Sequence, residues 1–93
     1  MSIESYKAHL GYPLIMVAIH GKLGVEHAPL FQLEPAVFDK MALQEIFAEA
    51  QDLYYEKKPI TTAGLIYRLG ARLKGRPLLE PITELLLSME SAK

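Results

Sequence analysis

A chain of 93 residues is long enough for one small domain and little more. Its hydrophobic fraction of 51% is typical of a globular domain rather than of a disordered segment. A net charge of −1 gives the whole molecule no electrostatic attraction to nucleic acid or to anionic membranes. Because the chain has no cysteine, disulfides, thiolate metal sites and a cysteine nucleophile are excluded.

Localisation is predicted from two absences in the sequence. The longest unbroken apolar run, Leu14 to Ile19, is far shorter than the ~20 residues that a membrane-spanning helix needs. The first residues, 1–4, lack the basic start and the small-residue cleavage site of a signal peptide. We therefore expect a cytoplasmic protein with a single domain over residues 1–93 and no contact with a membrane.

The run from Leu14 to Ile19 predicts a short helix that is apolar on nearly every side and therefore central in the fold. Pro13 is compatible with its first turn, where a backbone N–H would have no helical partner anyway. Gly21 and Gly24 predict its end. A buried strand remains an alternative over the same residues, because the run is short and partly β-branched.

The segment from His27 to Pro35 is predicted to be a connection that contains a short turn. Two prolines six residues apart, Pro29 and Pro35, disfavour a long helix there. Four apolar side chains of this region are expected to pack against the core: Leu30, Phe31, Leu33 and Val37.

The strongest helical pattern extends from Pro35 to about Lys57. Its apolar residues recur three or four positions apart and predict a core face: Phe38, Met41, Ala42, Ile46, Ala50 and Leu53. Its acidic residues form another stripe that is predicted to face water: Glu45, Glu49, Asp52 and Glu56. Pro59 disfavours helical geometry at Lys58 and so predicts the end of this helix.

A further helix is predicted after Pro59, with Thr61 or Thr62 as its N-cap. Its inward-facing residues are expected to be Leu65, Ile66, Leu69 and Leu73. Gly64 and Gly70 weaken such a helix by up to ~1 kcal/mol each relative to alanine, which suggests close packing against a neighbour.

The sequence Gly75-Arg76-Pro77 predicts a stop, and Pro81 is expected to open a last helix. The side chains on one side of that helix are Ile82, Leu85, Leu86 and Met89. No strand alternation of convincing length occurs in the sequence. We therefore predict an all-α fold, a compact bundle of about five short helices.

Patterns typical of catalysis or of metal binding are missing from the sequence. His9, His20 and His27 are too far apart for two of them to lie on adjacent turns of one helix. Residues 21–24 resemble a phosphate loop but lack its upstream glycine, and Leu23 stands where a hydroxyl would hold magnesium. No serine–histidine–acid arrangement is indicated. We expect no catalytic residue, no metal, no cofactor and no enzymatic activity.

Residues 65–76 are basic and contain no acidic residue. The basic side chains are Arg68, Arg72, Lys74 and Arg76. The first two lie one turn apart on the face opposite the apolar stripe, with Tyr67 beside them. Such a cluster suits a salt-bridged protein interface or a weak nucleic-acid contact. The alternatives are that the arginines simply meet solvent, or that the acidic helix before them neutralises them within the fold.

Exposed tyrosines are a second indication of a binding surface. Tyr54 and Tyr55 are adjacent, so both rings cannot face one core, and one is expected to meet solvent or a partner. The candidate partner-binding residues are Tyr55, Tyr67, Arg68, Arg72 and Arg76. Direct binding of nucleic acid is expected to be weak or absent.

The spacing of apolar residues from position 38 to position 69 resembles that of the N-terminal domain of the bacterial DnaB-type replicative DNA helicase. The matching residues, in register without a gap, are Phe38, Ile46-Phe47, Leu53, Pro59-Ile60, Leu65 and Leu69. Residues 14–19 and 85–87 are similar to the first and last core helices of that family. Two positions depart from its pattern: Leu43 replaces a histidine, and Thr61 replaces an aspartate, a mild change because threonine also caps helices.

This resemblance implies a helical, non-catalytic module that packs in the collar of the helicase hexamer and supports contacts with primase and loader proteins. The helicase-binding domain of bacterial primase shares the same fold. The expected partners are therefore a replicative helicase or a primase. The family's motor domain and the helical hairpin that makes its tight dimer contact are both missing, so we expect a monomer or a weak homodimer.

Three functions are consistent with the sequence. The chain is the head of a larger helicase, or a stand-alone phage or mobile-element protein that binds and modulates a replicative helicase or primase. Alternatively it is an unrelated helical adaptor that shares the apolar spacing by accident.

Overall fold

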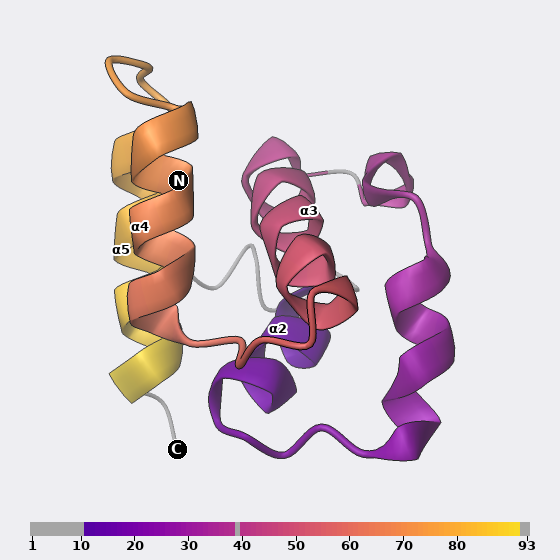
Figure 1. Ribbon diagram of the computed structural model, residues 1–93. Helices are drawn as coiled ribbons and strands as arrows, with labels where there is room; N and C mark the ends of the chain where they lie inside the picture. Colours follow the sequence, from indigo (N-terminus) through magenta and orange to yellow (C-terminus); the bar gives the residue numbers. More distant parts are fainter. Residues whose placement is uncertain (1–10, 39, 92–93) are drawn as a thin grey trace.

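The computed structural model describes residues 11–38 and 40–91, which form four α-helices and two 3₁₀ helices (Figure 1). With the labels of Figure 1, these are α2 (Gly11–Ile19), η1 (Val25–Gln32), η2 (Pro35–Val37), α3 (Met41–Tyr55), α4 (Thr62–Arg72) and α5 (Leu79–Ser91). No strand occurs among the described residues. The predicted all-α bundle is therefore confirmed.

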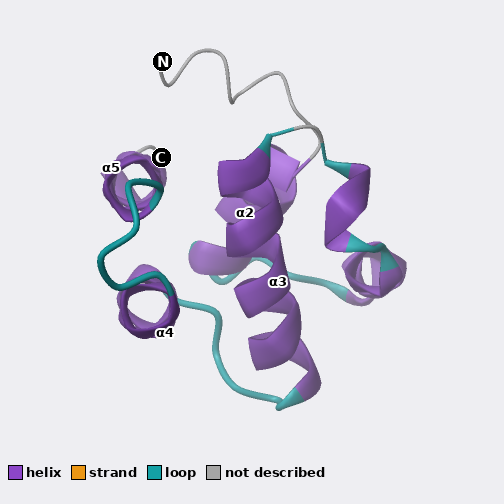
Figure 2. Cartoon of the chain, turned by 90° about the horizontal axis from the view of Figure 1, so that it is seen from above, coloured by secondary structure: helices purple, strands orange, loops and turns teal. Residues whose placement is uncertain are grey.

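Helix α3 is the centre of the bundle. It packs against α2, α4, α5 and η2. Helices α4 and α5 form an antiparallel pair on one side, and η1 and η2 lie on the opposite side of α3 (Figures 1 and 2). Residues 14–19 were predicted to form the central helix. The central position is instead taken by α3, which packs against more elements than α2 does.

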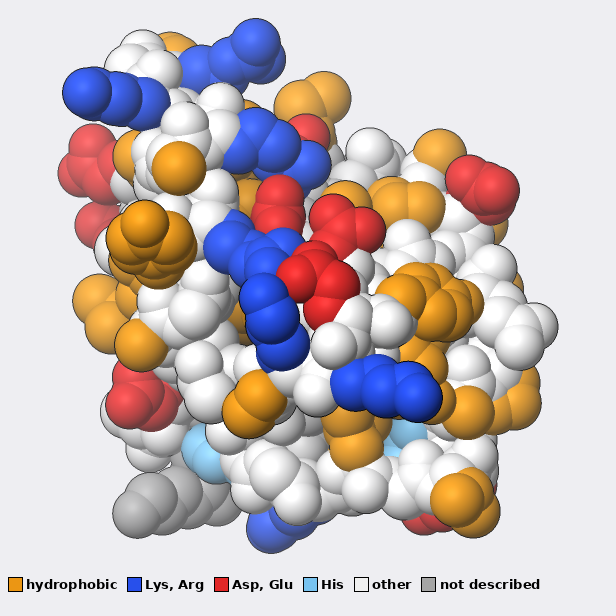
Figure 3. Space-filling model, viewed as in Figure 1, with side chains coloured by type: hydrophobic (Ala, Val, Ile, Leu, Met, Phe, Trp, Pro, Cys, Tyr) orange, Lys and Arg blue, Asp and Glu red, His pale blue; other side chains and the backbone are white. Residues whose placement is uncertain are grey.

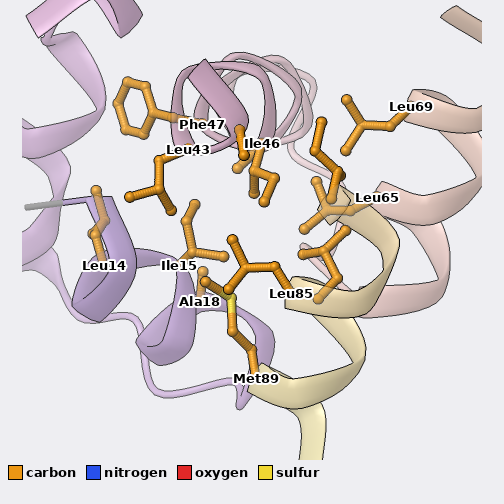
Figure 4. Close-up of a cluster of buried hydrophobic side chains, with 14 of the residues drawn as sticks. Leu14, Ile15, Ala18, Leu43, Ile46, Phe47, Leu65, Leu69, Leu85 and Met89 are labelled. Atoms are coloured by element: carbon orange, nitrogen blue, oxygen red, sulfur yellow. The ribbon is translucent and has the colours of Figure 1, made fainter. Parts of the chain in front are cut away.

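The hydrophobic core lies where the four α-helices meet (Figure 4). Each of them contributes at least two fully or nearly fully buried side chains to it. The labelled residues are Leu14, Ile15 and Ala18 from α2, Leu43, Ile46 and Phe47 from α3, Leu65 and Leu69 from α4, and Leu85 and Met89 from α5. Burial on this scale supplies the main driving force for folding.

Residues 14–19 lie in helix α2 and do not form the buried strand that the sequence left as an alternative. It ends as predicted at Gly21, whose φ of 69° lies in the left-handed region. The N–H of Lys22 donates to the carbonyl of Val17 at 2.9 Å, and the N–H of Gly21 donates to that of Ala18 at 3.1 Å. This pair of bonds satisfies the last carbonyls of the helix and requires a positive φ, which glycine adopts without strain.

The segment before α3 is more regular than predicted, because η1 extends over eight residues. It includes Pro29. A 3₁₀ helix tolerates this proline because its φ values are close to the value that the ring imposes. Phe31 is fully buried and stacks on Tyr54 with ring centroids 4.3 Å apart, while Leu30 and Leu33 pack partly against the core. The prediction for Val37 is wrong, because η2 leaves this side chain exposed.

Helix α3 begins at Met41, later than the predicted start at Pro35, because Phe38 and Lys40 have extended backbone angles. As a result Met41 stands on the first turn and is 63% exposed, so its predicted place in the core face is wrong. Leu43 and Phe47, which were left out of the predicted stripe, are fully buried. The apolar face of α3 is wider than the stripe because several elements pack around this helix.

Local signals at the ends of α4 and α5 are mostly confirmed. The Oγ1 of Thr61 accepts a hydrogen bond from the N–H of Gly64 at 3.0 Å and caps α4. The prediction that close packing explains both glycines is wrong for Gly70, where a Cβ would meet no atom within 4 Å. At Gly64 a Cβ would lie 3.0 Å from the capping Oγ1 of Thr61. Helix α5 begins at Leu79, slightly before the predicted Pro81. It buries the four predicted side chains, Ile82, Leu85, Leu86 and Met89.

Candidate protein-interaction surface

The basic face of α4 lies against the acidic face of α3. On the face of the molecule shown in Figure 3, Lys and Arg side chains on the α4 side meet Asp and Glu side chains on the α3 side. Arg68 donates two parallel hydrogen bonds of 2.9 Å to the two carboxylate oxygens of Glu56. Arg72 pairs with both Glu45 and Glu49. The two helices thus neutralise each other within the fold, which was one of the alternatives left open by the sequence.

Glu49 is the buried member of this network. It is only 7% exposed, so the prediction that it faces water is wrong. Its Oε1 lies 3.3 Å from the Nε of Arg72, and its Oε2 lies 3.9 Å from the Nη1 of Arg68. Burying a carboxylate is costly unless cations offset the lost hydration. Two arginines one turn apart on α4 supply that compensation because they face the same turn of α3.

Glu56 and Arg68 form the exposed edge of the network. The guanidinium of Arg68, together with the ammonium of Lys58 at 3.1 Å, lowers the pKa of Glu56 to about 2. The same hydrogen bonds to Glu56 raise the pKa of Arg68 above its ordinary value. Both groups therefore remain charged over the whole physiological pH range.

The five predicted partner-binding residues do not form one patch. Arg68 and Arg72 are held against α3, and the hydroxyl of Tyr55 donates to the carbonyl of Phe31 at 2.9 Å, which ties α3 to η1. Tyr67, by contrast, is 81% exposed on the outer face of α4. Of the two adjacent tyrosines, Tyr55 is the exposed one and Tyr54 is half-buried, as expected for neighbours that cannot face one core.

Arg76 lines an open groove of about 440 Å³ between the first turn of α3 and the α4–α5 connection. The other lining residues are Met41, Glu45, Leu73, Pro77, Leu78 and Pro81. The exposed thioether of Met41 gives this groove an apolar and adaptable wall. Sequence reasoning missed the groove because it assigned Met41 to the core, and because the groove exists only where α3 meets a connection more than thirty residues further along the chain.

The two described histidines, His20 and His27, each form a hydrogen bond with the backbone. The Nε2 of His20 lies 2.9 Å from the carbonyl oxygen of Met89, and the Nδ1 of His27 accepts from the N–H of Gly24 at 2.9 Å. His9 lies outside the described residues. Across residues 11–38 and 40–91, no group of three or more ligating side chains could hold a metal ion. Within the same residues, no helix has the length and apolarity needed to cross a membrane.

Comparison with known proteins returns no relative. No family model matches this chain, no curated protein matches its sequence, and no solved structure matches its fold. The all-α class therefore rests on the structure itself, and the likeness to the helicase N-terminal domain remains a prediction from residue spacing.

Proposed function

We propose that this chain is a non-catalytic protein-interaction domain of the DNA replication machinery, with a replicative helicase or a primase as its partner. The observation that carries the interaction role is the exposure of Tyr67, at 81%, on the outer face of α4. Tyrosine supplies a large and rather rigid contact area, and it is enriched among the residues that dominate binding energy at interfaces. The inner face of the same helix is already used by α3, so the outer face is the one that α4 can offer to a partner.

The replication partner is proposed from the resemblance, and the resemblance rests on core residues. Seven of its apolar positions are buried: Phe38, Ile46, Phe47, Leu53, Ile60, Leu65 and Leu69. The residues that carry the resemblance are therefore core positions of this bundle. Leu43, the departure from the family's histidine, is fully buried too, and an apolar side chain suits that position because an imidazole there would lose its hydration.

Charge reversal of Arg68 or Arg72 is a poor test of this proposal. Either substitution would place a new carboxylate against Glu49 and its acidic neighbours on α3, and would destabilise the fold whether or not a partner binds there. Substitutions on the outer face avoid this problem, because Tyr67 makes no contact that the core needs.

The test measures binding of the purified chain to replicative helicase and to primase from the same source by isothermal titration calorimetry. Tyr67→Ala is expected to weaken binding about tenfold, as for a central interface aromatic. Leu87→Ala on α5 is the matched control, because Leu87 is also exposed, at 52%, and should leave affinity unchanged. The absence of binding to either protein at micromolar concentrations would overturn the replication assignment and leave the helical-adaptor alternative.

A further inference from the structure

A second groove, of about 430 Å³, lies between the end of α2 and the connection from α3 to α4. We call it the Lys57 groove. Its apolar lining includes Ile19, Leu23, Tyr54, Pro59 and Ile60. Lys57 and Lys58 are its charged lining residues, and no carboxylate is found among the described residues that line it. An apolar floor beside lysines fits a ligand that is itself apolar and acidic.

Lys57 occupies an unfavourable backbone conformation. Three described residues have a positive φ: Gly21 at 69°, Gly75 at 79° and Lys57 at 61°. The N–H of Lys57 donates to the carbonyl of Tyr54 at 3.1 Å, and that of Lys58 donates to the carbonyl of Leu53 at 3.0 Å, so α3 ends in the same turn as α2. Glycine is the residue that this turn favours, and a side chain there costs free energy. The chain has a lysine at the turn that ends α3, whereas glycine occupies the same turn at the end of α2.

The charge of Lys57 is a further feature of the groove. Lys58 is held by Glu56, with its Nζ 3.1 Å from Oε1. Lys57 makes no ion pair with a described residue, and it is exposed beside the groove. The strained backbone, an ammonium that has no ion pair among the described residues, and the apolar floor thus occur at one place.

We propose that the Lys57 groove docks an apolar and acidic segment of a partner protein. Its apolar side chains pack against Leu23 and Ile60, and a carboxylate of the segment pairs with Lys57. This inference rests on the proposed function in that the occupant is a protein, and it adds the chemistry of the partner's segment. It does not depend on the partner being a helicase or a primase.

The test uses two synthetic peptides and the full ¹⁵N-labelled chain, followed by NMR titration. One peptide is an amphipathic helix of leucine and glutamate, and its twin carries lysine in place of each glutamate. The acidic peptide is expected to shift the amide signals of Leu23, Lys57 and Ile60, and the basic twin is expected to leave them in place. Shifts confined to other parts of the molecule, or equal shifts with both peptides, would overturn the proposal.

The decisive variant is Lys57→Gly, because it separates binding from folding. It is expected to raise the melting temperature, since it relieves the positive φ, and yet to weaken binding of the acidic peptide about tenfold by removing the charge. Lys74→Ala is the matched control, an exposed lysine on the α4–α5 connection that should leave peptide affinity unchanged. Unchanged affinity in Lys57→Gly would contradict the assignment of the groove.

Helicase and primase binding is measured in parallel with the same variants, so that the two proposals fail separately. Peptide docking in the Lys57 groove without helicase or primase binding overturns the replication assignment alone. Helicase or primase binding together with no peptide shifts at the groove overturns the groove alone.

Discussion

Glu49 of α3 is buried against Arg72 of α4, with Oε1 of the carboxylate 3.3 Å from Nε of the guanidinium. Arg68 approaches the other oxygen of the same carboxylate at 3.9 Å. This relationship joins the central helix to the helix that carries the exposed Tyr67. It therefore sets the orientation of the outer face through which we propose that the domain binds.

Replacing Glu49 by glutamine should destabilise the fold. The neutral amide keeps the volume of the carboxylate but loses its ion pairs with two partly exposed arginines, at a cost of about 1 kcal/mol in the free energy of unfolding. Urea denaturation monitored by circular dichroism measures the change. Glu84→Gln on α5 is the same substitution at an exposed position and should stay within about 0.5 kcal/mol of the wild type. An equally small effect at both positions would show that the ion pairs of Glu49 contribute nothing net to stability.

Acid should weaken the fold partly through Glu56. Its pKa is lowered from 4.5 to about 2 in the folded chain, so the carboxylate stabilises the fold fully above pH 4.5 and loses that contribution as the pH falls toward about 2. In Glu56→Gln this contribution is absent at every pH. The free energy of unfolding should therefore fall less steeply between pH 5 and pH 2 in the variant than in the wild type. If the free energy of unfolding depended on pH in the same way in both proteins, the lowered pKa of Glu56 would be contradicted.

Alanine at Gly70 should stabilise helix α4. A Cβ there meets no atom within 4 Å, so the gain of about 0.5–1 kcal/mol comes from the lower entropy of the unfolded chain and from better helix propensity. Gly64→Ala is the control within the same helix, and it should gain less because its Cβ would lie 3.0 Å from the capping Oγ1 of Thr61. Thermal unfolding of both variants gives the comparison, and a larger gain at Gly64 would reverse the interpretation.

The two positive-φ turns that end α2 and α3 should respond in opposite directions. Gly21→Ala forces a side chain into the left-handed region and should cost about 1 kcal/mol, although no atom lies within 4 Å of the new Cβ. Lys57→Gly removes a side chain from the same region and should gain about 1 kcal/mol. Chemical denaturation of the two variants measures both effects. A loss of stability in Lys57→Gly would mean that its side chain holds the fold together, which the Lys57 groove proposal does not expect.

Much of the helical architecture was predictable because its signals are local. Apolar spacing located α3, α4 and α5 and most of their buried side chains. The cap at Thr61 and the stop at Gly21 depend on residues within one turn of each other. Errors in the predicted ends of elements led to errors in predicted burial. Helix α3 begins later than predicted and so exposes Met41, and the separate turn of η2 exposes Val37.

The candidate surfaces were less predictable, because they are formed by residues that are distant in the sequence. Arg68 and Arg72 have the pattern of an exposed basic stripe, and the acids that neutralise them lie on another helix. The Lys57 groove needs Leu23 and Ile60 to line one surface, and no periodicity predicts that they lie near each other.

By itself, the sequence determined the all-α class, the helix-forming segments and most of the core, since hydrophobic periodicity, caps and turn residues act over a few positions. The tertiary structure alone decided which polar faces reach solvent. Glu49 and Glu56 belong to one acidic stripe and both lie near Arg68 of α4, yet the first is buried and the second exposed. Glu49 lies within α3 and is also covered by Arg72, whereas Glu56 follows the last turn of α3.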